Sequence, residues 1–146
     1  MAEKRARGVL VTVFGVIGTA CFGFLALEYV LARYDALGAI IDLPAPFGLG
    51  NFLDVMPDWA AFATTAGIWL GVLGAVLLLL GDRASVLVLA LAMLANLVAL
   101  VWGVLAFAQG QTLIVTIRPL EYLGALVLGS FGLWLYARTA KRYGRL

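Results

Sequence analysis

Two long apolar runs, separated by Gly81-Asp82-Arg83, lie at the centre of this chain. The runs, residues 59–80 and 84–107, are each long enough for an α-helix to cross the hydrocarbon core of a bilayer, which takes about 20 residues. A break this short leaves room for a tight turn, so the two helices are expected to lie side by side and antiparallel. The pattern predicts a transmembrane helical hairpin around which the rest of the chain is arranged.

Two further apolar runs flank the hairpin, at residues 8–32 before it and 119–137 after it. Pro119 fits the first turn of a helix, where its missing backbone N–H costs nothing. We therefore predict an all-α integral membrane protein, a single domain over residues 1–146 with four antiparallel transmembrane helices.

The connection between the first and second spans is long and acidic. Its stretches 34–43 and 51–56 mix apolar and acidic residues, which favours short interfacial helices or turns. Pro44 and Pro46 interrupt any longer helix. We predict a long, partly helical loop on the outer surface, whereas the loop at 108–118 is short and polar.

The composition indicates that lipid is the solvent for most of the chain. Of the 146 residues, 64% are hydrophobic and 12% are charged, whereas a soluble domain is about 25% charged. Eight acidic and ten basic side chains are too few to cover a water-exposed surface. The net charge of +2 is too small to indicate nucleic-acid binding, so the bilayer itself is the expected partner.

The basic residues are divided unequally between the two sides of the predicted bundle. Four spans place both termini on one side, which carries eight Lys and Arg residues, while Arg33 and Arg118 lie on the other. The positive-inside rule therefore puts both termini in the cytoplasm of a bacterial inner-membrane protein. A basic start also fits a signal peptide, but the run 8–32 is too long and lacks a convincing cleavage site, so we expect an uncleaved helix. The eight are Lys4, Arg5, Arg7, Arg83, Arg138, Lys141, Arg142 and Arg145.

The chain contains one cysteine, Cys21, and no histidine. Histidine is the commonest ligand for zinc, copper and haem iron, and a single cysteine cannot form an intramolecular disulfide. We therefore predict no cofactor, no metal site and no enzymatic activity.

Glu28 is the most suggestive polar position within a span. Counted from Gly8 at about 1.5 Å per residue, it lies about 30 Å along the first helix, near the outer interface. An ionisable group in a span is a functional candidate by default, and proton-coupled small multidrug transporters use a first-helix Glu in this way. The alternative interpretation is an interfacial carboxylate paired with Arg33 or Arg118.

Six polar side chains are expected at the same depth near the outer surface. Glu121 falls in the first turn of the fourth span, where the helix dipole favours a negative charge, so a structural role suffices for it alone. If the first and fourth spans are adjacent, the six form one cluster at which a small polar ligand or a partner protein would bind. They are Glu28, Tyr29, Arg33, Arg118, Glu121 and Tyr122.

Asn96 and Trp69 are both expected near mid-membrane. A buried amide can link helices through a hydrogen bond worth about 1 kcal/mol, and we favour this role, with core packing, over ligand binding. Gly67 and Gly71 form a GxxxG pair, for which we favour packing against the first or third helix over a dimer motif. The other tryptophans, Trp59, Trp102 and Trp134, lie near span ends, as an interfacial aromatic belt predicts.

Several short segments between residues 14 and 102 resemble a family of small four-helix bacterial inner-membrane proteins, frequently labelled hypothetical or putative sugar transporter. The central hairpin is also distantly similar to DoxX-like proteins. The resemblance implies a four-span fold and carries no substrate-binding residue across. The segments are Glu28-Tyr29, Pro57-Asp58-Trp59, the stretch IWLGVLGA at 68–75, and Arg83-Ala84.

These observations lead to two functional hypotheses. The first is a non-catalytic accessory or assembly subunit of a larger membrane complex, because the spans carry smooth faces of small residues and no catalytic motif. The alternative is a small oligomeric solute transporter in which Glu28 is the coupling carboxylate. A lipid- or quinone-linked enzyme would have no supporting residues beyond the outer polar cluster.

Overall fold

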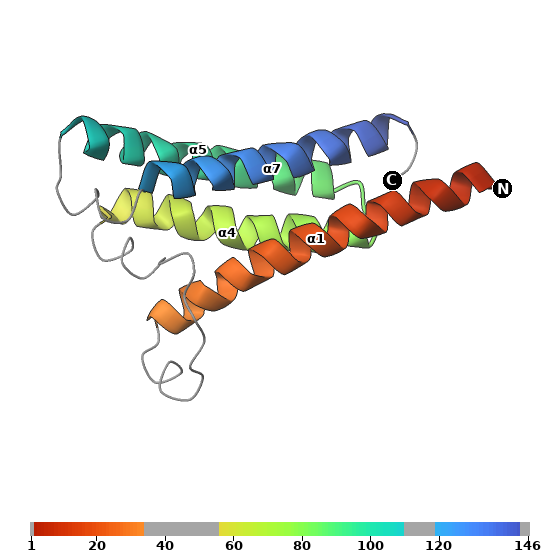
Figure 1. Ribbon diagram of the computed structural model, residues 1–146, viewed down its shortest axis with the longest axis horizontal. Coiled ribbons are helices and arrows are strands. Elements are labelled where there is room, and N and C mark those ends of the chain that lie inside the picture. Colours follow the sequence, from red (N-terminus) through yellow and green to blue (C-terminus); the bar gives the residue numbers. More distant parts are fainter. Residues whose placement is uncertain (1, 34–55, 110–118, 144–146) are drawn as a thin grey trace.

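The computed structural model describes residues 2–33, 56–109 and 119–143. Within these residues the chain forms four helices and no strand (Figure 1). All four are long and apolar enough to cross a membrane, which agrees with the predicted all-helical membrane fold. The helices are α1 (Ala2–Arg33), α4 (Asp58–Leu79), α5 (Ser85–Ala108) and α7 (Pro119–Arg142).

Both terminal helices are longer than the apolar runs that predicted them. α1 begins at Ala2, six residues before the predicted start, and α7 continues to Arg142, beyond the predicted end at residue 137. Hydropathy marks where a chain leaves lipid, whereas a helix continues as long as its residues favour it. Lys141 and Arg142 in the last turn of α7 interact favourably with the helix dipole. Of the predicted interfacial segments 34–43 and 51–56, only Met56 belongs to the described residues, and the loop residues 110–118 lie outside them as well.

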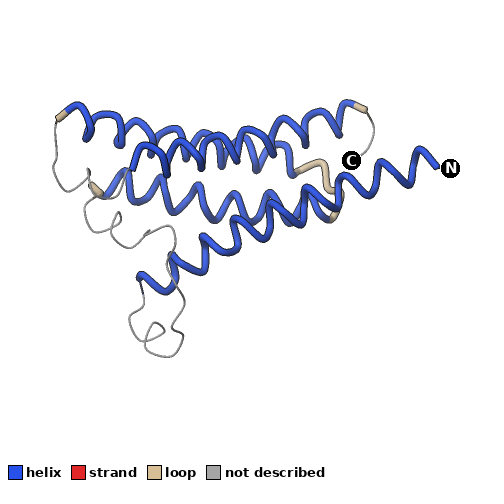
Figure 2. The backbone as a smooth tube through the Cα atoms, viewed as in Figure 1, coloured by secondary structure: helices blue, strands red, loops and turns tan. Residues whose placement is uncertain are grey.

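A short turn connects α4 to α5 (Figure 2). Gly81 takes the left-handed conformation, with φ at 74°. Its N–H donates to Leu78 O at 3.0 Å and the Asp82 N–H donates to Leu77 O at 2.9 Å, which is the Schellman pattern of helix termination. Asp82 Oδ1 then accepts a hydrogen bond from the Ala84 N–H at 2.8 Å. The turn thus ends one helix and starts the next within a few residues.

α4 lies between α1 and α5, and α7 packs against α5 (Figure 1). α1 touches α7 in the middle part of α1, where the rings of Phe14 and Tyr136 stack with centroids 4.3 Å apart and Gly18 faces Leu133. Towards Arg33, α1 diverges from the other helices. The bundle is therefore open along one side rather than closed on itself.

The glycines of α4 allow its close packing. The place of a Cβ on Gly71 is occupied by the ring of Phe22 from α1, and that on Gly74 lies 2.7 Å from Leu89 Cγ of α5. Gly67 lies in the same way against Asn96 of α5. The GxxxG pair therefore packs against both the first and the third predicted span, which confirms the interpretation as internal packing.

Candidate functional site

Asn96 forms a polar link inside the bundle. Its side chain is 1% exposed, and Nδ2 donates a hydrogen bond to Ser130 Oγ of α7 at 2.6 Å. Ser130 Oγ in turn donates to Leu126 O at 2.7 Å. The other amide atom, Asn96 Oδ1, faces Gly67 of α4 and has no hydrogen-bond partner among the described residues. Three helices thus meet at one amide, and the helix-linking hydrogen bond is the one expected from the sequence.

Trp69 lies away from Asn96. Its side chain is 44% exposed, on a different face of α4 from the buried Gly67. Its ring meets that of Tyr29 on α1 edge to face, with centroids 6.3 Å apart. The structure therefore separates the two predicted mid-membrane candidates and joins Trp69 to the end of α1 that carries Glu28.

Glu28 is 6% exposed. Contacts fix its level along α4, because Gly15 meets Leu79 and Phe22 meets Gly71. Extending this register by six residues brings Glu28 level with about residue 65, roughly 10 Å along the axis from Asp58 at the start of α4. Because Asn96 lies beside Gly67, this register puts Glu28 and Asn96 about half a helical turn apart in level, roughly 3 Å. The contacts thus give a deeper position than counting from Gly8.

The six-residue polar cluster stays a prediction. Glu28 is buried and Tyr29 is partly buried, but the other four side chains lie outside the described residues. In Figure 1 the Arg33 end of α1 lies apart from the Pro119 end of α7. The two helices contact each other away from these ends, at Phe14 and Tyr136. The four undescribed side chains are Arg33, Arg118, Glu121 and Tyr122.

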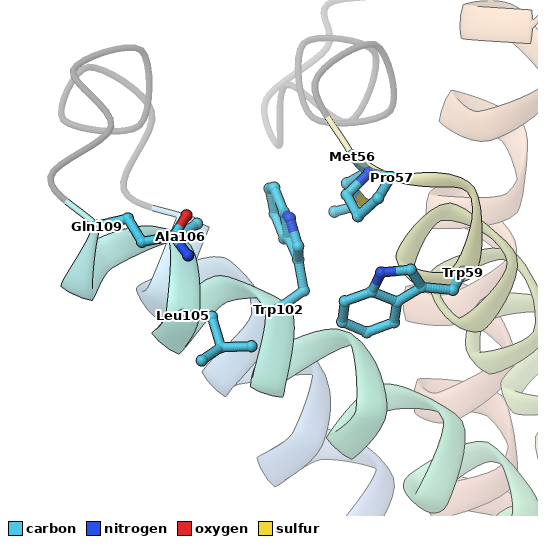
Figure 3. A pocket seen from close by; sticks show the side chains of 7 residues that line it. All are labelled: Met56, Pro57, Trp59, Trp102, Leu105, Ala106 and Gln109. Atoms are coloured by element: carbon cyan, nitrogen blue, oxygen red, sulfur yellow. The ribbon is translucent and has the colours of Figure 1, made fainter.

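A pocket of about 420 Å³ lies between the start of α4 and the end of α5. Figure 3 shows the Trp102 ring standing in its wall, opposite Met56 and Pro57 and beside the ring of Trp59. From the sequence, Trp59 and Trp102 are predicted to be residues of the interfacial belt. The one sequence signal for a pocket is that both occur at the same end of the predicted hairpin. The lining residues are Met56, Pro57, Trp59, Trp102, Leu105, Ala106 and Gln109.

The described residues contain no group of three His, Cys, Asp or Glu side chains that could hold a metal ion. A scan against protein-family models finds no match, and neither the curated proteins nor the solved structures that were searched give one.

Proposed function

We propose that this chain is a non-catalytic membrane protein that packs beside other membrane helices as an accessory or assembly subunit of a larger complex. One observation carries the proposal: the glycines of α4 and α7 differ in what surrounds them. At the α4 glycines, the position that a Cβ would take is occupied by side chains or backbone of neighbouring helices. A Cβ on Gly124, Gly129 or Gly132 of α7 would meet nothing within 4 Å in the structure as described.

Gly129 and Gly132 belong to an exposed face of α7. Ala125 lies one turn before Gly129 on the same face and is also exposed. In a bilayer, association of helices depends on close packing, and small residues let two backbones approach. A smooth face that no described helix of this chain covers supports packing against a helix from another chain.

The proposed topology is an antiparallel four-helix bundle in a bacterial inner membrane, with both termini in the cytoplasm. Arg83 in the α4–α5 turn, Arg138 and Lys141 are exposed. The Arg138 guanidinium also lies 5.4 Å from the centroid of the Trp134 ring, an arrangement suited to a membrane interface. A concentration of cations at the end that holds the turn and the α7 terminus supports a cytoplasmic assignment of that end.

The test is purification at native expression level in mild detergent, followed by mass spectrometry of the proteins that co-elute. The variant Gly129→Leu/Gly132→Leu adds bulk to the open face of α7 without entering the interior of the bundle. We expect the wild-type chain to elute with stoichiometric membrane proteins and this variant to lose them. Gly23→Leu on α1 is the matched control, because a Cβ there also meets nothing within 4 Å in the described structure.

Three outcomes have distinct meanings. Retention of the same partners by the α7 variant would exclude this face as the contact. Wild-type protein that elutes as a stable monomer without partners would overturn the proposal. A homogeneous homo-oligomer without other proteins would favour the transporter function described next over the subunit function.

The second candidate is a small oligomeric solute transporter in which Glu28 is the coupling carboxylate. The observation that favours it is the level of Glu28, which the contacts of α1 bring near that of Asn96. Transporter coupling sites are expected near the midplane. Because an ionisable group there is energetically costly, its presence is a functional signal.

Ethidium efflux from everted membrane vesicles tests this candidate, because a membrane carboxylate that exchanges protons can also take a lipophilic cation. Transport requires that Glu28→Gln abolish a proton-driven efflux that the wild-type protein produces, while Asp58→Asn, an exposed carboxylate at the start of α4, leaves it intact. Equal efflux in wild type and Glu28→Gln would exclude the coupling role.

A further inference from the structure

The pocket between α4 and α5 combines hydrogen-bond donors with an uncharged wall. Met56, Leu105 and Ala106 supply apolar surface, and no Asp, Glu, Lys or Arg belongs to the described lining. The donors are the indole N–H groups of Trp59 and Trp102 and the amide of Gln109. A wall of this kind suits a neutral ligand that carries an acceptor oxygen on an apolar body.

The burial of Trp102 distinguishes this pocket from an ordinary belt of interfacial tryptophans. Its side chain is 7% exposed, whereas that of Trp59 is 48% exposed. The hydrogen bonds of the described residues include none from the Trp102 indole N–H, although the N–H of a largely buried Trp usually finds a partner. In Figure 3 the nitrogen edge of the Trp102 ring faces Met56 and Pro57 across the pocket. The Trp102 N–H is therefore a donor that faces the pocket and is available to an acceptor there.

The bilayer itself offers a neutral acceptor of this kind. Interfacial tryptophans lie at the level of lipid head groups, next to the ester carbonyls that join the acyl chains. Leu105 in the wall is half exposed, so the pocket borders the surface that faces lipid. The volume of about 420 Å³ lies within the range of small-molecule pockets and is large enough for an ester group with part of its acyl chain.

We propose that this pocket binds the acyl-ester segment of one membrane lipid. The Trp102 N–H donates to the ester carbonyl oxygen, and the first part of the acyl chain lies against Met56, Leu105 and Ala106. The site contacts the uncharged ester region of the lipid and not its head group. It therefore distinguishes ester-linked from ether-linked lipids, and it does not distinguish lipids by head-group charge. This inference is independent of the proposed subunit function.

Fluorescence quenching in nanodiscs tests the proposal. In one protein, Trp59, Trp69 and Trp134 are replaced by Phe, so that Trp102 is the sole reporter; in a second, Trp59 is kept instead. Each is titrated with diacyl phosphatidylcholine brominated on acyl carbons near the ester, in an unbrominated background. The same titration is repeated with the ether-linked analogue, which has no carbonyl oxygen.

We expect Trp102 to be quenched in a saturable way by the ester lipid, at a mole fraction about fivefold below that for the ether lipid, which corresponds to one hydrogen bond of about 1 kcal/mol. Trp59, which borders bulk lipid, should respond equally to both. Quenching of Trp59 without quenching of Trp102 would overturn the proposal, because lipid would then contact the belt and not enter the pocket. Equal quenching of Trp102 by both lipids would overturn carbonyl recognition.

A filling substitution gives an independent measurement. Ala106 is 3% exposed and lines the pocket, so Ala106→Leu should occupy the space and reduce quenching of Trp102. Ala108→Leu, at an exposed position of the same helix, is the matched control and should leave quenching unchanged. Unchanged quenching in a folded Ala106→Leu protein would also contradict the proposal.

Discussion

Asn96 Oδ1 of α5 lies in the space that a Cβ on Gly67 of α4 would occupy. The buried amide and the missing side chain are thus complementary, and the same amide donates to Ser130 of α7. Three helices, α4, α5 and α7, thus meet at the side chain of Asn96.

Gly67→Ala should destabilise the bundle by about 1–3 kcal/mol, because the new methyl group overlaps the amide of Asn96 and forces it to move. The measurement is unfolding in mixed micelles of dodecyl maltoside and SDS, followed by circular dichroism. Gly132→Ala on the open face of α7 is the control, and it should leave stability unchanged or raise it by up to about 1 kcal/mol through the higher helix propensity of Ala. Equal effects of the two substitutions would contradict the close contact.

The Asn96–Ser130 hydrogen bond predicts a measurable coupling. In a double-mutant cycle with Asn96→Ala and Ser130→Ala, the two effects on unfolding free energy should be non-additive by about 0.6 to 1.7 kcal/mol, the range for hydrogen bonds within membranes. Purely additive effects would show that the bond stabilises the helix contact no more than its replacement by apolar groups.

Hydropathy predicted all four spans because a bilayer demands helices with apolar side chains, and this demand is local in sequence. It did not predict that α1 begins as early as Ala2 or that α7 continues to Arg142, since hydropathy marks apolar segments and not helix ends. The role of Asn96 was also predictable, because a lone amide in an apolar helix needs a partner. That its neighbours are Ser130 and Gly67 could not be predicted, because this depends on which helices pack together.

The rest of the candidate site depends on the relative positions of helices. Trp69 pairs with Tyr29 because α1 packs against α4 on a face that the sequence alone does not identify. The level of Glu28 likewise follows from the Gly15–Leu79 contact rather than from the start of the apolar run. The pocket is formed where the ends of α4 and α5 meet, so no single segment encodes it.

Tyr29 and Trp69 should contribute to the packing of α1 on α4. Tyr29→Ala should lower stability by about 0.5–1.5 kcal/mol beyond the loss of buried area, because it removes an edge-to-face aromatic pair, whereas Tyr29→Phe keeps the ring and should cost less. The measurement is the same micelle unfolding, repeated in a Trp69→Leu background. If Tyr29→Ala has the same effect in that background, the two rings do not interact.

The orientation of the bundle can be tested at the two ends of α4. Positive-inside asymmetry predicts that Arg83 faces the cytoplasm and Asp58 the outer side, and both side chains are exposed. In a Cys21→Ala background, which removes the only native thiol, a membrane-impermeant maleimide should label Asp58→Cys in intact cells and label Arg83→Cys only after permeabilisation. Labelling of both variants after permeabilisation is the control for thiol reactivity. The reverse pattern would place the termini outside, and the basic end of the molecule would then need another cause, such as contact with an anionic partner.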